Sequence, residues 1–217
     1  MGVSERRQRE KEARRSSILN SARDLFYRAG YEGTKMADIA DACELSKGAV
    51  YLYFKNKVEL ARAVVIESYD DLLDLIEDVA AQQSTGAEKA ESALQAFAEF
   101  YRNHYQSFYL TLVLESHLRE QAMETGEWPE YNQRLHEIKE VVRGVLEYGI
   151  ADGTLRATLD PNVMAVTLVN AAAGFFHRIV TSGVLVPEDG VELEEYVTEF
   201  FQILLRALTP IEHSIRT

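Results

Sequence analysis

The chain has 217 residues, 47% of them hydrophobic, so it is long enough for one large domain or two small ones with a substantial core. A single cysteine excludes an intrachain disulfide, and the longest uncharged run, Pro161 to His177, is 17 residues and too short to span a bilayer. The first 15 residues lack the apolar segment of a signal peptide, so we expect a cytoplasmic protein.

The net charge of −12 is unevenly distributed along the chain. Residues 1–60 carry twelve Lys and Arg against nine Asp and Glu, whereas the remainder carries eleven against twenty-six. A basic amino-terminal segment on an acidic body indicates phosphate affinity at one end, although the acidic part needs no role beyond solubility.

Residues 1–15 form an Arg-rich arm in which Glu residues are interleaved. Such an arm is compatible with insertion of Arg into a narrow minor groove, and equally with a frayed, solvated terminus. A first helix is then predicted to about Ala29, with Gly30 as the residue that ends it. Its expected buried stripe is Ile18, Ala22, Leu25, Phe26 and Ala29.

Two short helices joined by a tight turn are predicted next. Thr34 is expected to cap the first of them, which carries apolar residues at helical spacing. Ser46 is expected to cap the second, about two turns long, in which Val50 and Phe54 share an inward face. The pattern predicts a helix-turn-helix.

The outward face of the second short helix suits the major groove of DNA. Gly48 and Ala49 allow close approach, Lys47 and the hydroxyls of Tyr51 and Tyr53 are suited to phosphates, and Leu52 is suited to a thymine methyl. An ordinary helical corner in an all-α core is the alternative at this point.

The run GYEGTKMADIADACELSKGAVYLYFKNKVEL resembles the DNA-binding domain of TetR-type transcriptional regulators, over about residues 10 to 65. The family pattern has a glycine closing helix 1, a threonine opening helix 2, and S-K-G-x-x-Y-x-Y-F-x-x-K across helix 3 and the start of helix 4. Those positions are Gly30, Thr34, Ser46, Lys47, Gly48, Tyr51, Tyr53, Phe54 and Lys57. From the residues and the resemblance together, the predicted DNA-binding set is Thr34, Lys35, Ser46, Lys47, Gly48, Ala49, Tyr51, Leu52, Tyr53 and Lys57.

The resemblance implies an all-α fold with a three-helix DNA-binding domain at residues 1–56 and a helical effector-binding and dimerisation domain at 57–217. It implies a ligand-responsive regulator, a repressor by default, that binds a palindromic operator as a homodimer. No cofactor, metal or membrane is implied.

The carboxyl-terminal part reads as a series of helices. The predicted ranges are a helix from 56 or 57 to 80, a loop at 81–89, a helix to 105, a shorter one at 107–118, a break at 119–129, a helix at 130–150, a helix opened by Asp160 and Pro161, and a last helix at 192–208. The last two are apolar almost all round, so we expect burial on more than one side. In TetR-like proteins the last two helices form a four-helix dimer bundle, and a purely intramolecular core is the alternative.

Aromatic and histidine residues gather in the middle of the chain, as expected for an apolar effector pocket between helices, although such stripes also form ordinary cores. The predicted ligand-binding residues are Tyr101, Tyr105, His117 and Phe176, with an apolar or aromatic effector favoured.

Two other function classes are less favoured by the sequence. The first is an all-α enzyme, but the sequence lacks the G-x-G-x-x-G, P-loop, G-x-S-x-G and carboxylate di-iron motifs. A metal site at His104, Glu115, His117 and Glu120 is less favoured than solvated or hydrogen-bonded core positions for these residues. The second is a helical interaction module that does not bind DNA, and this class would assign no role to the Lys47–Tyr53 face.

Overall fold

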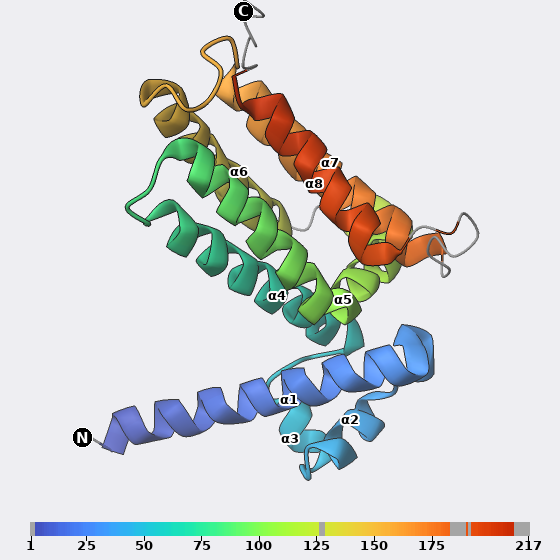
Figure 1. Ribbon diagram of the computed structural model, residues 1–217. Helices are drawn as coiled ribbons and strands as arrows, with labels where there is room; N and C mark the ends of the chain where they lie inside the picture. Colours follow the sequence, from blue (N-terminus) through green and yellow to red (C-terminus); the bar gives the residue numbers. More distant parts are fainter. Residues whose placement is uncertain (1–2, 126–128, 183–189, 191, 211–217) are drawn as a thin grey trace, which may run out of the picture. The chain divides into compact units, whose positions relative to one another are not determined.

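In a computed structural model the residues described are all-helical or lie in connecting turns, as the sequence predicts. The description covers residues 3–125, 129–182, 190 and 192–210; side chains at 3, 105–107, 111–112, 114–125 and 180–182 lie outside it. In chain order the helices are α1 (Val3–Gly33), α2 (Met36–Ala42), α3 (Lys47–Tyr51), α4 (Lys57–Ala80), α5 (Gly86–Thr125), α6 (Pro129–Ala151), α7 (Pro161–Ser182) and α8 (Leu193–Leu208) (Figure 1). Among the helices of these described ranges, none qualifies as a membrane-spanning segment.

Contacts divide the chain into two compact units. Unit 1 is Met1–Ser68 with Gln106–Glu127, and unit 2 is Tyr69–Tyr105 with Trp128–Thr217. The helices α4 and α5 therefore each contribute to both units. The domain boundary predicted at 56–57 falls at the start of α4, and it remains a proposal.

Unit 1 is built around the amphipathic half of α1. Gly30 adopts a φ of 74°, a left-handed conformation that glycine tolerates best, so the regular helix ends where the sequence predicts. α2 packs against both α1 and α3. The fully or nearly fully buried apolar side chains of this unit include Ile18, Leu19, Ala22, Phe26, Ile39, Ala40, Val50, Phe54, Leu60, Ala61 and Val64.

The start of α4 is fixed by reciprocal capping. The Asn56 side-chain oxygen accepts from the Glu59 amide at 2.8 Å, and the Glu59 carboxylate accepts from the Lys55 amide at 2.7 Å. The first bond satisfies an amide of the first turn that the helix itself leaves without a partner, and the second joins that turn to the residue before Asn56. The predicted helix to Ala80 is confirmed.

Unit 2 holds a close crossing of α5 and α6 at two glycines. A Cβ on Gly86 would lie 2.5 Å from the Gly149 amide nitrogen, so only glycine fits at this crossing. The Gly86 amide donates to Asp152 at 2.7 Å, and the Ala87 amide donates to the Thr154 hydroxyl at 2.9 Å. Hydrogen bonds from Thr154 and from the Gly86 amide lower the pKa of Asp152 below its ordinary value of 3.8.

Three predicted boundaries need correction. The loop after α4 ends at Thr85 and not at 89, because the Glu88 carboxylate accepts from the Thr85 amide and hydroxyl, both at 2.8 Å, and starts α5 early. The break predicted near 105 is a kink at His104, with φ −118° and ψ 21°. The second part of α5 then continues to Thr125 instead of ending at 118.

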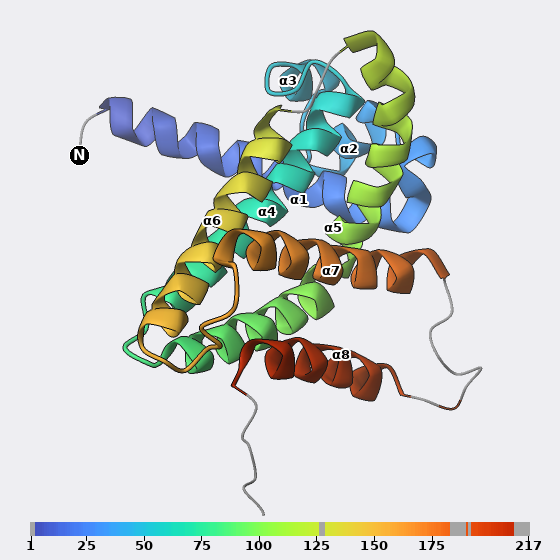
Figure 2. The same ribbon diagram turned by 90° about the horizontal axis from the view of Figure 1, so that it is seen from above.

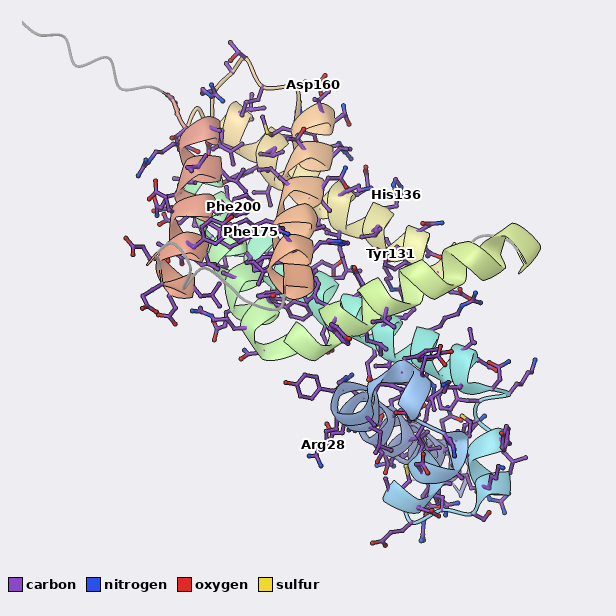
Figure 3. All side chains as sticks on the ribbon, turned by 90° about the vertical axis from the view of Figure 1, so that its right-hand side faces the viewer. Arg28, Tyr131, His136, Asp160, Phe175 and Phe200 are labelled. Atoms are coloured by element: carbon purple, nitrogen blue, oxygen red, sulfur yellow. The ribbon has the colours of Figure 1, made fainter. Side chains whose placement is uncertain are left out.

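The helices α7 and α8 run side by side in opposite directions. Phe175 and Phe200 stack face to face between them, with centroids 3.9 Å apart (Figure 3), and the Arg156 amide before α7 donates to the Leu208 carbonyl at the end of α8 at 2.9 Å. The Asp160 cap is confirmed, because its side chain accepts from the Asn162 and Val163 amides at 2.9 and 3.2 Å.

Candidate DNA-binding surface and effector region

The helix-turn-helix is formed by α2, a short turn and α3. The turn carries no glycine, and Glu44 adopts a left-handed φ of 56° instead. The Leu45 amide donates to the Ala40 carbonyl at 2.9 Å, closing the end of α2. Ser46 then caps α3 as predicted, its hydroxyl oxygen accepting from the Ala49 amide at 3.2 Å.

The two faces of α3 and the turn that follows differ sharply in burial, as the helical spacing predicts. Val50 is fully buried and Phe54 nearly so, whereas Leu52 is 86% exposed and Tyr51 is 42% exposed. Two large apolar side chains are therefore exposed at consecutive positions. Lys47 and Gly48 are exposed beside them, and Ala49 and Tyr53 are half-buried.

Gly48 has no packing reason to be glycine. A Cβ placed on it would meet nothing within 4 Å, and its φ is not in the left-handed region. A glycine inside a helix costs about 0.5–1 kcal/mol relative to alanine, so its presence here calls for another explanation. Close approach of another molecule to the α3 backbone provides one.

Thr34 does not have its predicted role. The helix α2 begins at Met36 with Lys35 as the capping residue, whose amide donates to Asp38 at 2.9 Å. The Thr34 side chain is buried, with its hydroxyl 2.8 Å from the Gly30 carbonyl oxygen and 3.1 Å from that of Leu25. The prediction that Thr34 is a helix cap is therefore wrong, and a buried hydroxyl facing α1 is not placed to reach a phosphate.

Lys57 is also turned inward. Its ammonium donates to the Tyr31 carbonyl at 2.7 Å and lies 4.2 Å from the centroid of the Tyr31 ring. The Glu32 carboxylate is 3.9 Å away, and burial raises the pKa of the Tyr31 hydroxyl above its ordinary value of 10. Lys57 thus ties the start of α4 to the end of α1, which favours a structural role over a DNA contact.

One anchoring residue is not evident from the sequence. The Arg15 guanidinium lies over the Phe54 ring, 5.6 Å from its centroid, and so joins α1 to the segment after α3. No local pattern reveals this contact, because the two residues are far apart in sequence.

In unit 2, two of the four predicted ligand residues lie together. Tyr101 of α5 and Phe176 of α7 are almost completely buried and stack with centroids 3.6 Å apart. Phe97 and Phe201 lie around the Phe176 ring, at 5.4 and 6.0 Å between centroids. The side chains of Tyr105 and His117 lie outside the described residues, as do those of Glu115 and Glu120.

Residues 18–64 match the family model described as bacterial regulatory proteins of the tetR family, and this range contains α2, the turn and α3. This segment of the chain is therefore a TetR-type DNA-binding domain. It is 35% identical over 77 residues to the uncharacterized HTH-type transcriptional regulator YfiR of Bacillus subtilis, covering 36% of this chain and 38% of YfiR. The chain thus spans less than half the length of the first curated relatives that it matches.

Other transcription regulators resemble the chain over more of its length. The HTH-type transcriptional repressor KstR2 of Rhodococcus jostii is 26% identical over 69% of this chain and 72% of its own. The solved structure of the regulator FadR from Bacillus subtilis, in complex with stearoyl-CoA, is 17% identical, covers 88% of this chain and 97% of FadR, and superposes with a TM-score of 0.67. Both of these proteins are transcription regulators.

Proposed function

We propose that this protein is a dimeric, ligand-responsive repressor whose α3 helices dock in the major groove of a palindromic operator. The observation that carries the proposal is the exposed face at residues 47–52. Lys47 and Gly48, a glycine that packing does not require, lie on α3, and Leu52, which is 86% exposed, caps its carboxyl end. The contacting set is Lys35, Ser46, Lys47, Gly48, Ala49, Tyr51, Leu52 and Tyr53; the inward positions of Thr34 and Lys57 remove them from it.

Dimerisation is proposed to occur through α7 and α8. Within the single chain, Val163 and Val166 on α7 are 62% and 46% exposed, and Tyr196 and Ile203 on α8 are 39% and 55% exposed. Gly174 in α7 is exposed, and a Cβ there would meet nothing within 4 Å, which leaves room for close helix approach. Apolar residues of this kind on two adjacent helices are what a symmetric four-helix interface would bury.

The effector is proposed to bind in unit 2 beside the stacked rings of Tyr101 and Phe176. This part of α5 and α7 is lined by aromatic side chains, so an apolar or aromatic ligand matches its chemistry. FadR, which has the same fold, was solved with stearoyl-CoA, a ligand with a long apolar chain. Stearoyl-CoA is therefore the first probe for a thermal-shift assay, with coenzyme A alone as the control for the polar part.

The test of DNA binding uses a duplex enriched from a random-sequence pool by the full-length protein. The double variant Lys47→Ala/Tyr53→Phe removes one charge and one hydroxyl from the proposed surface, and we expect its affinity to fall by at least about tenfold. The matched control Lys139→Ala/Tyr148→Phe makes the same changes on α6 and should bind normally. Equal affinities of the two variants, with the fold and dimer intact, would refute the assignment of this surface.

A further inference from the structure

The helix α7 divides into a buried face and an exposed face. Figure 2 shows α7 running alongside α8 in unit 2, and the buried residues of α7 recur at helical spacing, as Ala165, Leu168, Ala172, Phe176 and Ile179. At about 100° per residue, seven exposed residues lie on the opposite side, within about 60° of a line through Asn170. This α7 stripe consists of Val163, Val166, Thr167, Asn170, Ala173, Gly174 and His177. The exposed residues Asn162 and Arg178 lie about 80° from the line, one on each side.

Asn170 lies at the centre of the α7 stripe. Val163 precedes it by seven residues and His177 follows it by seven, which is about two turns in each direction. Residues repeated at this spacing stay on one line when two helices pack together along their length. A Cβ on Gly174, one turn away, would meet nothing within 4 Å. A partner helix can therefore approach α7 closely beside Asn170.

The Asn170 amide is the polar group at the middle of this mostly apolar stripe. The Thr167 hydroxyl lies 2.7 Å from the Val163 carbonyl oxygen and is satisfied within the helix. Among the residues that the structure describes, none hydrogen-bonds to the Asn170 side chain. An amide carries two N–H donors and an oxygen acceptor, and covering them with apolar groups alone is unfavourable. A molecule that covers the stripe must therefore offer this amide both a donor and an acceptor.

The charges on α7 and α8 favour a second copy of the chain as that molecule. In a two-fold symmetric contact a residue on the axis meets its own copy, so a charged residue there would face a like charge. The α7 stripe contains no Lys, Arg, Asp or Glu, whereas α8 exposes Glu194, Glu195 and Glu199. An axis beside α7 therefore avoids repulsion between carboxylates. The Asn170 amide is also self-complementary, because each oxygen can accept an N–H of the other copy.

We propose that α7 crosses α7 of a second copy at Asn170, where the two Asn170 amides hydrogen-bond to each other and make the dimer contact selective for this chain in this register. This inference rests on the proposed function, because it requires α7 to lie in the dimer interface. A single asparagine in a contact between helices fixes register and partner at some cost in stability. Register matters here because a slip by one helical turn would shift the subunits by about 5.4 Å, and the two α3 helices would no longer match the spacing of one operator.

The contact is tested by oxidative crosslinking of the full-length protein in a Cys43→Ser background, which removes the native thiol. A disulfide forms only where the two Cα atoms come within about 7 Å of each other. We expect Asn170→Cys to crosslink the dimer at least about tenfold faster than the matched control Asn162→Cys. Position 162 lies on the same helix but away from the line through Asn170, so it does not meet its own copy.

Asn170→Asp tests the amide pair by charge. Two facing carboxylates should weaken the dimer at least about tenfold at pH 7, whereas Asn162→Asp should leave the dimer Kd unchanged. Like charge raises the pKa of the introduced carboxyl in the dimer above its ordinary value of about 3.9, so the dimer should strengthen again as the pH falls toward that range. His177 is the other ionisable residue of the stripe and is present in both variants, so their difference isolates position 170. A defect in folding would not be reversed by acid.

Selectivity is measured by mixing differently labelled wild-type and Asn170→Val copies. A pair of valines buries no amide, so this variant should dimerise at least as tightly as wild type. A mixed dimer leaves one amide without a partner, and we expect it to form at least about tenfold less than random pairing gives. Wild type mixed with Asn162→Val is the control and should pair at random.

The outcomes separate this inference from the proposed function. If the wild type is a monomer in light scattering, the proposed dimer fails and this inference fails with it. If the wild type is a dimer but the Cys and Asp variants at position 170 behave like those at 162, Asn170 does not meet its copy and this inference alone is wrong. If Asn170→Val pairs with wild type at random, the amides do not select the partner, and the claim of selectivity is overturned.

Discussion

Replacing Gly48 by alanine should strengthen the fold and weaken DNA binding at the same time. The position is inside a helix, its φ is not left-handed, and a Cβ there would meet nothing within 4 Å. Alanine therefore gains the helix preference of about 0.5–1 kcal/mol without a steric cost in the free protein. For a chain of this length, that corresponds to a rise in Tm of about 1–4 °C.

The effect on DNA binding comes from the same methyl group. If α3 lies against a duplex at Gly48, the methyl enters a filled contact, and overpacking of this kind costs about 1–3 kcal/mol. A loss of that size weakens Kd by about 5- to 150-fold. The two effects have opposite signs, so a general loss of stability cannot imitate them.

Thermal unfolding and fluorescence anisotropy on an enriched duplex measure the two quantities. Gly144→Ala is the matched control, because Gly144 is an exposed glycine inside α6 where a Cβ would also meet nothing within 4 Å. It should stabilise the protein similarly and leave Kd unchanged. A Gly48→Ala protein that is more stable but binds DNA as tightly as wild type would show that α3 does not approach DNA at this residue.

Three further predictions concern unit 2. Gly86→Ala should destabilise the protein by about 1–3 kcal/mol or more, because its Cβ would overlap the Gly149 backbone, and an unchanged denaturation midpoint would contradict this. Asp152→Ala should lower Tm at neutral pH. Because the pKa of Asp152 is depressed, the stabilisation by its carboxylate is present above about pH 3.8 and is lost as the pH falls further. The Tm difference from wild type should therefore shrink in acid, and a constant difference would argue against a charge effect. Val166→Arg with Ile203→Arg should convert a dimer to a monomer in light scattering, whereas a persisting dimer would exclude the exposed face of α7 and α8 as the interface.

Local rules predicted the helix starts well where the capping group had no competing partner. Ser46 and Asp160 cap their helices through bonds to amides two or three residues later, which sequence spacing alone specifies. Thr34 looks the same in sequence, but its hydroxyl is held by carbonyls of the preceding helix. A cap prediction therefore fails where tertiary packing offers a hydroxyl another acceptor.

The distant contacts could not be predicted from spacing. Lys57 resembles a free surface cation in sequence, and only the fold brings it over the ring of Tyr31. The crossing of Gly86 with Gly149 likewise depends on how α5 and α6 meet. By contrast, the inward and outward faces of α3 follow from period alone, so the core of the candidate surface was predictable while its supporting contacts were not.

The most direct test of the central claim is hydroxyl-radical footprinting of the full-length protein on a duplex enriched from a random-sequence pool. Docking of one α3 from each subunit predicts two protected patches related by two-fold symmetry, with centres about one helical turn or a multiple of it apart. The enriched sequence should be a palindrome or close to one. Failure to enrich any sequence, or a single patch without symmetry, would contradict the account.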